Sequence, residues 1–172
     1  MKTVLNSEQM EALSDPLRSQ LVLALRAYGS GSVSDLATRL SKDPKTLYYP
    51  LKCLQSAGLV REVGKQRGKR RPESVYALTA DQFEISRDTS LEARAKLIKT
   101  SIRIAEREFL AAQARESASD ALNIIRSQLW LEADAKSAFL ARLAELSQEF
   151  SERSVVGRGE LIHWTSLVSP AS

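Results

Sequence analysis

The chain has 172 residues, of which 43% are hydrophobic and 27% charged, a composition that supports a packed core and excludes general disorder. No stretch is apolar over the roughly 18 residues that a bilayer-spanning helix needs, and the N-terminus has no apolar run typical of a signal peptide. The single cysteine, Cys53, excludes a disulfide framework within one copy. We therefore expect a cytoplasmic protein without a membrane partner.

The net charge of +4 is unevenly distributed along the chain. Residues 1–80 carry 13 Lys and Arg against 7 Asp and Glu, a balance of +6, whereas residues 81–172 carry 12 against 14, a balance of −2. The cations concentrate between residues 61 and 71, where one acid, Glu62, lies among Arg61, Lys65, Arg67, Lys69, Arg70 and Arg71. Such a cluster suits a polyanionic partner, although a solvated loop would have the same composition.

Three helices are predicted after a short N-terminal one that carries Met10 and Leu13. Asp15-Pro16 and Asp43-Pro44 are strong helix starts, since an N-cap side chain precedes a proline at the first helical position; Ser32 is a third N-cap. Each helix carries apolar residues at helical spacing, which we expect to be buried: Leu17, Leu21, Leu25 and Tyr28; Val33, Leu36, Ala37 and Leu40; Leu47, Leu51 and Leu54.

A β-hairpin is predicted directly after the third of these helices. Ala57-Gly58 supplies a left-handed helix stop, and two short strands follow, with Gly64 and Gly68 expected in the basic turn between them. Two helices joined by a short turn, with a hairpin behind them, make a winged helix-turn-helix. In that arrangement the second helix of the pair is the recognition helix that enters the major groove of DNA, and the hairpin is the wing.

From about residue 81 the chain has a helical pattern. After a short connector with Phe83 and Ile85, a long helix is expected to start near residues 89–90, and further helices near Ser119 and Ala133. The long helix carries a heptad seam of apolar residues: Leu91, Ala95, Ile98, Ile102, Ala105 and Phe109. This seam is predicted either to pair with a second copy or to pack on the last helix of the same chain. We favour the homodimer, because three helices alone make a thin core.

Four segments of the first half occur in a specific order and spacing: SDPLRSQLVLAL (Ser14–Leu25), SVSDLATRL (Ser32–Leu40), TLYYPLKCLQSAGLV (Thr46–Val60) and SVYALT (Ser74–Thr79). Through these segments, residues 14–79 resemble the arsenic-repressor-type (ArsR-like) winged helix-turn-helix family of bacterial transcription regulators. The resemblance implies a homodimer that binds a near-palindromic operator on double-stranded DNA, usually as a repressor. The predicted fold is mainly α with a small β-wing: a winged helix-turn-helix DNA-binding domain over residues 1–80, then a helical dimerisation region, with a possible effector site, over residues 81–172.

The chain departs from the family in two places. Metal-sensing members carry cysteine pairs or acid–histidine sets, but this chain has one cysteine and one histidine, Cys53 and His163, so we predict no metal site and no cofactor. The second departure is Pro50. A proline at the seventh residue of a helix costs about 3 kcal/mol. The recognition helix is therefore expected either to kink at Pro50 or to start later than Pro44.

DNA-contacting residues are predicted from helical spacing and charge. On the recognition helix, Lys45, Thr46 and Tyr49 are assigned to base edges or nearby phosphates, and Lys42 and Lys52 to phosphates. Tyr48 is assigned either to DNA or to packing against the helix of residues 15–28. On the wing, the cations expected to meet phosphates or a minor groove are Lys65, Arg67, Lys69, Arg70 and Arg71.

Other functions have less support in the sequence. An enzyme is not expected, because the histidine and the cysteine are far apart and GKQRGKRR lacks the setting of a phosphate-binding loop. A winged-helix module that binds protein instead of DNA is the alternative, supported by Pro50 and opposed by the basic wing. A third hypothesis is a regulator gated by an organic ligand that binds among aromatic side chains of the C-terminal half. The simpler interpretation is that these side chains only pack in a core or an interface: Trp130, Phe139, Phe150, His163 and Trp164.

Overall fold

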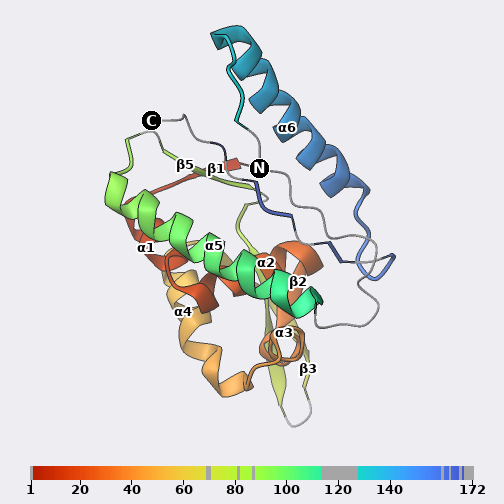
Figure 1. Ribbon diagram of the computed structural model, residues 1–172. Helices are drawn as coiled ribbons and strands as arrows, with labels where there is room; N and C mark the ends of the chain where they lie inside the picture. The colour runs from red at the N-terminus through yellow and green to blue at the C-terminus, as the bar shows by residue number, and fades with distance from the viewer. Residues whose placement is uncertain are drawn as a thin grey trace. The chain divides into compact units, whose positions relative to one another are not determined.

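The computed structural model describes residues 2–68, 71–80, 82–86, 88–113, 128–159, 161–162, 164–166 and 168 (Figure 1). The chain divides into two compact units, Met1–Glu108 and Phe109–Ser172, each of which is described by itself. Among the described residues, no helix is long and apolar enough to cross a membrane.

Helices α1 (Ser7–Leu13), α2 (Pro16–Tyr28) and α3 (Val33–Leu40) begin at residues that cap them. The side chains of Asn6, Asp15 and Ser32 accept hydrogen bonds from backbone N–H groups of the first turn, which would otherwise be unpaired. Two of these starts are full capping boxes, at Asn6 and at Ser32. The predicted starts of the helices at residues 16 and 33 are confirmed.

The recognition segment is divided in two. A 3-10 turn, η1 (Pro44–Thr46), precedes helix α4 (Tyr48–Ser56), so Pro50 is the third residue of α4 and not the seventh of a longer helix. The first four N–H groups of a helix have no partner within it, and a proline there removes nothing. The first regular bond at this point runs from the Leu51 N–H to the Leu47 carbonyl, 3.0 Å away. Of the two expected outcomes, the later helix start is the one observed.

The wing is part of a three-stranded sheet. Strands β3 (Val60–Arg67) and β4 (Pro72–Leu78) form an antiparallel hairpin, and β2 (Ser30–Ser32) adds to the other edge of β4. Strand β2 was not predicted, since three small residues carry no alternating apolar pattern. Gly64 does not lie in the turn as expected: it lies within β3, at a register shift that leaves Val63 unpaired as a bulge.

A second, two-stranded sheet joins distant parts of the first unit. Strand β1 (Lys2–Leu5) pairs in parallel with β5 (Gln82–Ile85), from Lys2 opposite Gln82 to Leu5 opposite Ile85. The predicted connector around Phe83 and Ile85 is therefore wrong, because those residues form a strand. Leu5 is buried in the core and Phe83 packs against it, so the pairing closes one side of the domain.

Helix α5 (Leu91–Gln113) belongs to the first unit as far as Glu108, and one of its faces packs on the core of that unit. Ile104 and Thr100 are buried, and Leu97 and Ala93 pack partly buried against the core. The Thr100 hydroxyl donates to the Ser14 carbonyl between α1 and α2, at 2.7 Å. The first compact unit ends at Glu108 and so includes most of α5.

The described part of the second unit consists mainly of helix α6 (Ala133–Arg153). It begins where the last predicted helix was expected. Its apolar residues remain at least partly exposed, among them Phe139, Leu146 and Phe150. The helix expected near Ser119 lies outside the described residues. Taken together, the helices and the β2–β4–β3 sheet confirm the predicted class, mainly α with a small β-wing.

Candidate nucleic-acid interface

The recognition segment separates buried apolar side chains from exposed polar ones. Leu47, Leu51 and Leu54 are 0%, 1% and 0% exposed, which anchors the segment in the core as the spacing predicted. Five residues assigned to DNA from the sequence lie exposed on this segment, and Lys42 lies exposed in the turn before it. The five are Lys45, Thr46, Tyr48, Tyr49 and Lys52. Tyr48 is 58% exposed, so most of its side chain is not used for packing against α2.

The 3-10 turn at the start of the segment is held by Asp43. Its carboxylate accepts from the Lys45 N–H at 2.8 Å, and its carbonyl accepts from the Thr46 hydroxyl at 2.7 Å. The proton of the Thr46 hydroxyl is therefore occupied within the turn. What Thr46 still offers a base pair is its methyl group and the acceptor lone pairs of its oxygen, of which the methyl suits a thymine methyl.

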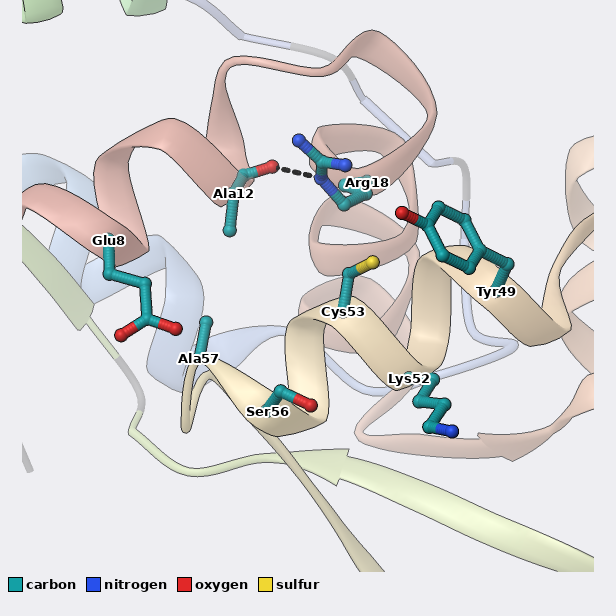
Figure 2. A pocket seen from close by; sticks show the side chains of 8 residues that line it. All are labelled: Glu8, Ala12, Arg18, Tyr49, Lys52, Cys53, Ser56 and Ala57. Carbon is teal, nitrogen blue, oxygen red and sulfur yellow. Dashed lines mark hydrogen bonds between the residues drawn. The ribbon is translucent and has the colours of Figure 1, made fainter.

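Tyr49 borders an open hollow of about 400 Å³ between α4 and the α1–α2 pair (Figure 2). The ring is 73% exposed, and the pKa of the Tyr49 phenol is raised, first of all by its hydrogen bond with Cys53 one turn later. Across the hollow, the Arg18 Nε donates to the Ala12 carbonyl at 2.5 Å, which fixes Arg18 against the end of α1 (Figure 2). Lys52, also exposed, lines the same hollow as Tyr49 and Cys53.

The wing carries its cations on an exposed hairpin. Lys65 and Arg67 lie on β3, and Arg71 directly precedes β4; all three are exposed. Lys69 and Arg70, also assigned to DNA, lie outside the described residues. Gly68 is required near the tip, because an added Cβ would lie 2.4 Å from the Arg71 carbonyl oxygen and 2.8 Å from the Glu73 side chain.

The predicted dimerisation seam lies on the face of α5 that is turned away from the core. Leu91 is 84% exposed, Ile98 43% and Ile102 47%, while Ala95, Ala105 and Phe109 are half-buried. The core-facing residues follow a separate stripe on the opposite side of the same helix. Sequence reasoning found the uncovered stripe and missed the covered one, since alanine and threonine give the covered stripe a weak apolar signal.

The aromatic residues considered for a ligand pocket are largely exposed in the part of the second unit that the structure describes. Trp130 is fully exposed, and Phe139, Phe150 and Trp164 are each more than a third exposed. His163 lies outside the described residues. Within the described residues, no group of three or more His, Cys, Asp or Glu side chains is placed to hold a metal ion.

Asp35 stabilises the first helix of the helix-turn-helix and predicts a pH-dependent stability. The backbone N–H of Ser32 is the main cause that lowers the pKa of Asp35 below its ordinary value of 3.8. The ionised form is thus favoured by folding, so its contribution is complete at neutral pH and is lost as the pH falls below 3.8. We expect Asp35→Asn to reduce the free energy of unfolding by about 1 kcal/mol at pH 7, since a helix N-terminus favours a negative charge.

Urea denaturation at pH 7 and at pH 3 measures this effect. The difference between wild type and Asp35→Asn should shrink at the lower pH. Asp88→Asn, which alters an exposed carboxylate in the loop before α5, is the matched control and should change little at either pH. An Asp35→Asn difference of equal size at both values would contradict a role for the charge.

A comparison with protein-family models agrees with this geometry. Residues 13–63 match a family model described as a helix-turn-helix domain, which confirms the resemblance seen in the sequence. A search of curated proteins finds no significant match. Among solved structures, the chain is similar to a mutant of Lactococcus lactis ZitR in its apo form, with 16% identity over 81% of this chain and 85% of that chain. The TM-score of that alignment is 0.29.

Proposed function

We infer that this chain, whose residues 13–63 match a helix-turn-helix family model, is a DNA-binding transcription regulator. One observation carries the inference. An exposed polar turn and helix, anchored by buried leucines, lies in the same domain as an exposed hairpin rich in lysine and arginine. In a winged helix-turn-helix, the recognition helix contacts base edges in the major groove and the basic wing contacts the phosphate backbone of the DNA. This domain has both features.

The roles of individual residues follow from chemistry. Lys45 and Thr46 occupy the start of the recognition segment, where a major groove admits side chains to base edges; Lys45 suits guanine acceptors and the Thr46 methyl suits thymine. Tyr49 is proposed to contact a base edge or an adjacent phosphate. Lys42, Lys52 and the wing cations are proposed to contact phosphates, which fix the register and supply most of the salt-dependent affinity.

A homodimer is proposed as the active form. The uncovered seam on α5 supports it, because its exposed leucine and isoleucine side chains would be removed from water when two copies pair. A two-fold dimer presents two recognition helices, which matches a near-palindromic operator. We propose that it acts in the cytoplasm as a repressor, by occupying an operator, with no catalytic step.

The alternative of a protein-binding winged helix loses its main support. It rested on Pro50 distorting the recognition helix, and Pro50 lies in the first turn of α4, where a missing N–H costs nothing. The exposed face of α4 is therefore regular and available to DNA.

Fluorescence anisotropy with the purified protein tests the function. The protein is titrated against duplexes from the DNA upstream of its own gene and against scrambled duplexes, across a range of salt concentrations. We expect a preference for the native region that persists as salt rises, because base contacts survive when phosphate contacts weaken. Equal and steeply salt-sensitive binding to both duplexes would leave a non-specific DNA binder, and no binding to either would overturn the proposed function.

A further inference from the structure

Both strands of the wing are tied to the start of helix α3 by side chains. On β3, the Gln66 amide nitrogen donates to the Ser32 hydroxyl and to the Asp35 carboxylate, each at 2.9 Å. Ser32 is fully buried and is the N-cap of α3, and Asp35 completes its capping box. The amide of Gln66 therefore uses both of its hydrogens on the two residues that define the start of this helix.

Glu73 makes the corresponding connection from β4. Its carboxylate accepts from the Ser34 hydroxyl at 2.7 Å and from the Ser34 backbone N–H at 3.4 Å. The Ser34 hydroxyl is the main cause that lowers the pKa of Glu73 below its ordinary value, so the carboxylate is ionised at neutral pH. It adds a negative charge to a helix N-terminus, where such a charge is favourable.

The two connections act at one level of the hairpin, because Gln66 and Glu73 are directly opposite each other in the β3–β4 register. Side chains alternate between the faces of a strand, so a Gln66 that faces α3 turns its neighbours Lys65 and Arg67 to the other face. We call the five residues of this network the wing anchor: Ser32, Ser34, Asp35, Gln66 and Glu73.

We propose that Gln66 and Glu73 are positioning residues that hold the basic wing at a fixed angle to the helix-turn-helix, so that wing and recognition helix meet DNA together. The proposal rests on the proposed DNA-binding function. A hairpin attached only by its strand ends would have to be ordered during binding, at a cost in affinity. With the wing anchor in place, the hairpin is already ordered in the free protein, and this cost in affinity is avoided.

Because Glu73 is negatively charged, the proposal can be tested by whether its removal strengthens or weakens DNA binding. Removing an acid from a DNA-binding hairpin should by electrostatics alone strengthen binding to a polyanion. If Glu73 positions the wing, its removal weakens binding instead. Glu62 is the matched control, because it is an exposed acid on β3 of the same hairpin that lies opposite Tyr76 and not at the level of Gln66 and Glu73.

The experiment compares Glu73→Ala, Glu73→Gln and Glu62→Ala by fluorescence anisotropy on the preferred duplex across salt. We expect Glu73→Ala to weaken binding by about three- to tenfold and to flatten the salt dependence, as phosphate contacts of the wing are lost. Glu73→Gln removes the same charge but keeps an oxygen that accepts from Ser34, so it should retain most of the affinity. Glu62→Ala should bind at least as tightly as wild type.

A charge-neutral variant supplies a second line of evidence. Ser34→Ala removes the partner of Glu73, and the double variant Ser34→Ala/Glu73→Ala should bind no more weakly than Glu73→Ala alone, since both changes break one interaction. If Glu73→Ala binds as tightly as Glu62→Ala, or Glu73→Ala and Glu73→Gln behave alike, the positioning role is wrong.

Hydrogen exchange on the free protein distinguishes a wrong positioning role for Glu73 from a wrong DNA-binding function. In Glu73→Ala, the wing amides from Lys65 to Arg67 should lose protection relative to wild type, whereas Glu62→Ala should keep it. Unchanged protection would overturn the proposal even if DNA binding is confirmed. Wild-type protein that binds no DNA, with wing protection still dependent on Glu73, would instead overturn the DNA-binding function on which the positioning role rests.

Discussion

Replacing Ile98 and Ile102 by aspartate is expected to convert the proposed dimer to a monomer and to abolish tight operator binding. Both side chains lie near the middle of the uncovered seam of α5, 43% and 47% exposed in the single chain. In a two-fold pairing each substitution occurs twice, so four carboxylates would lose water at an apolar interface, at a cost of several kcal/mol. Loss of the second recognition helix should then weaken binding to a two-half-site duplex by about a hundredfold or more.

Sedimentation equilibrium gives the oligomeric state, and anisotropy on duplexes with one and two half-sites gives the binding. Leu110→Asp is the matched control: it places an acid on the same helix at an exposed leucine that lies off the seam, and it should leave the dimer intact. Binding to a single half-site should change little in the double variant, since the winged helix itself is untouched. A stable dimer of the Ile98→Asp/Ile102→Asp variant would place the interface elsewhere.

Neutralising the wing is expected to weaken binding to every DNA sequence alike. Arg70→Ala combined with Arg71→Ala removes two cations from each hairpin of a dimer. Each lost phosphate contact reduces the slope of log K against log salt by about 0.9, so the salt dependence should flatten measurably. At low salt the affinity should fall by roughly tenfold or more, and the ratio between operator and scrambled DNA should remain nearly constant, because phosphate contacts carry no sequence information.

Lys136→Ala combined with Arg142→Ala serves as the comparison, since it removes the same charge from exposed positions on α6. A general loss of positive charge would affect both pairs of variants, whereas phosphate contact at the wing affects only the first. An unchanged salt slope in the Arg70→Ala/Arg71→Ala variant would contradict a wing that contacts DNA.

The DNA-binding half of the fold could be predicted from sequence because its signals are local. Asp15-Pro16 and the Ser32 capping box mark helix starts within a few residues, and the leucines of the recognition segment repeat at helical spacing and are buried. The alternating pattern of β4 and the stop at Gly58 likewise depend on neighbours in the chain. These features need no knowledge of the tertiary structure.

The features that the sequence did not predict depend on contacts between residues far apart in the chain. Phe83 and Ile85 form a strand because β1 is available as a partner, and four residues of ordinary composition carry no sign of that. Gln66 and Glu73 read as solvated polar residues of a basic hairpin, and their bonds to Ser32, Ser34 and Asp35 depend on how β3 and β4 lie against α3. The start of α4 stayed open in the sequence, because Pro50 fits either a kinked helix or one that begins later, and the later start is observed.

The parallel pairing of β1 with β5 also has a consequence for how the chain assembles. Paired residues such as Lys2 and Gln82 are separated by 80 positions, so their contact closes nearly the whole winged helix into one loop. Contacts of such high sequence separation form late and slow folding down, whereas the helices and the β3–β4 hairpin need only near neighbours. On a ribosome, β1 emerges long before β5 does. Strand β1 therefore remains unpaired until β5 has been synthesised. We expect it to be among the last elements to join the folded domain.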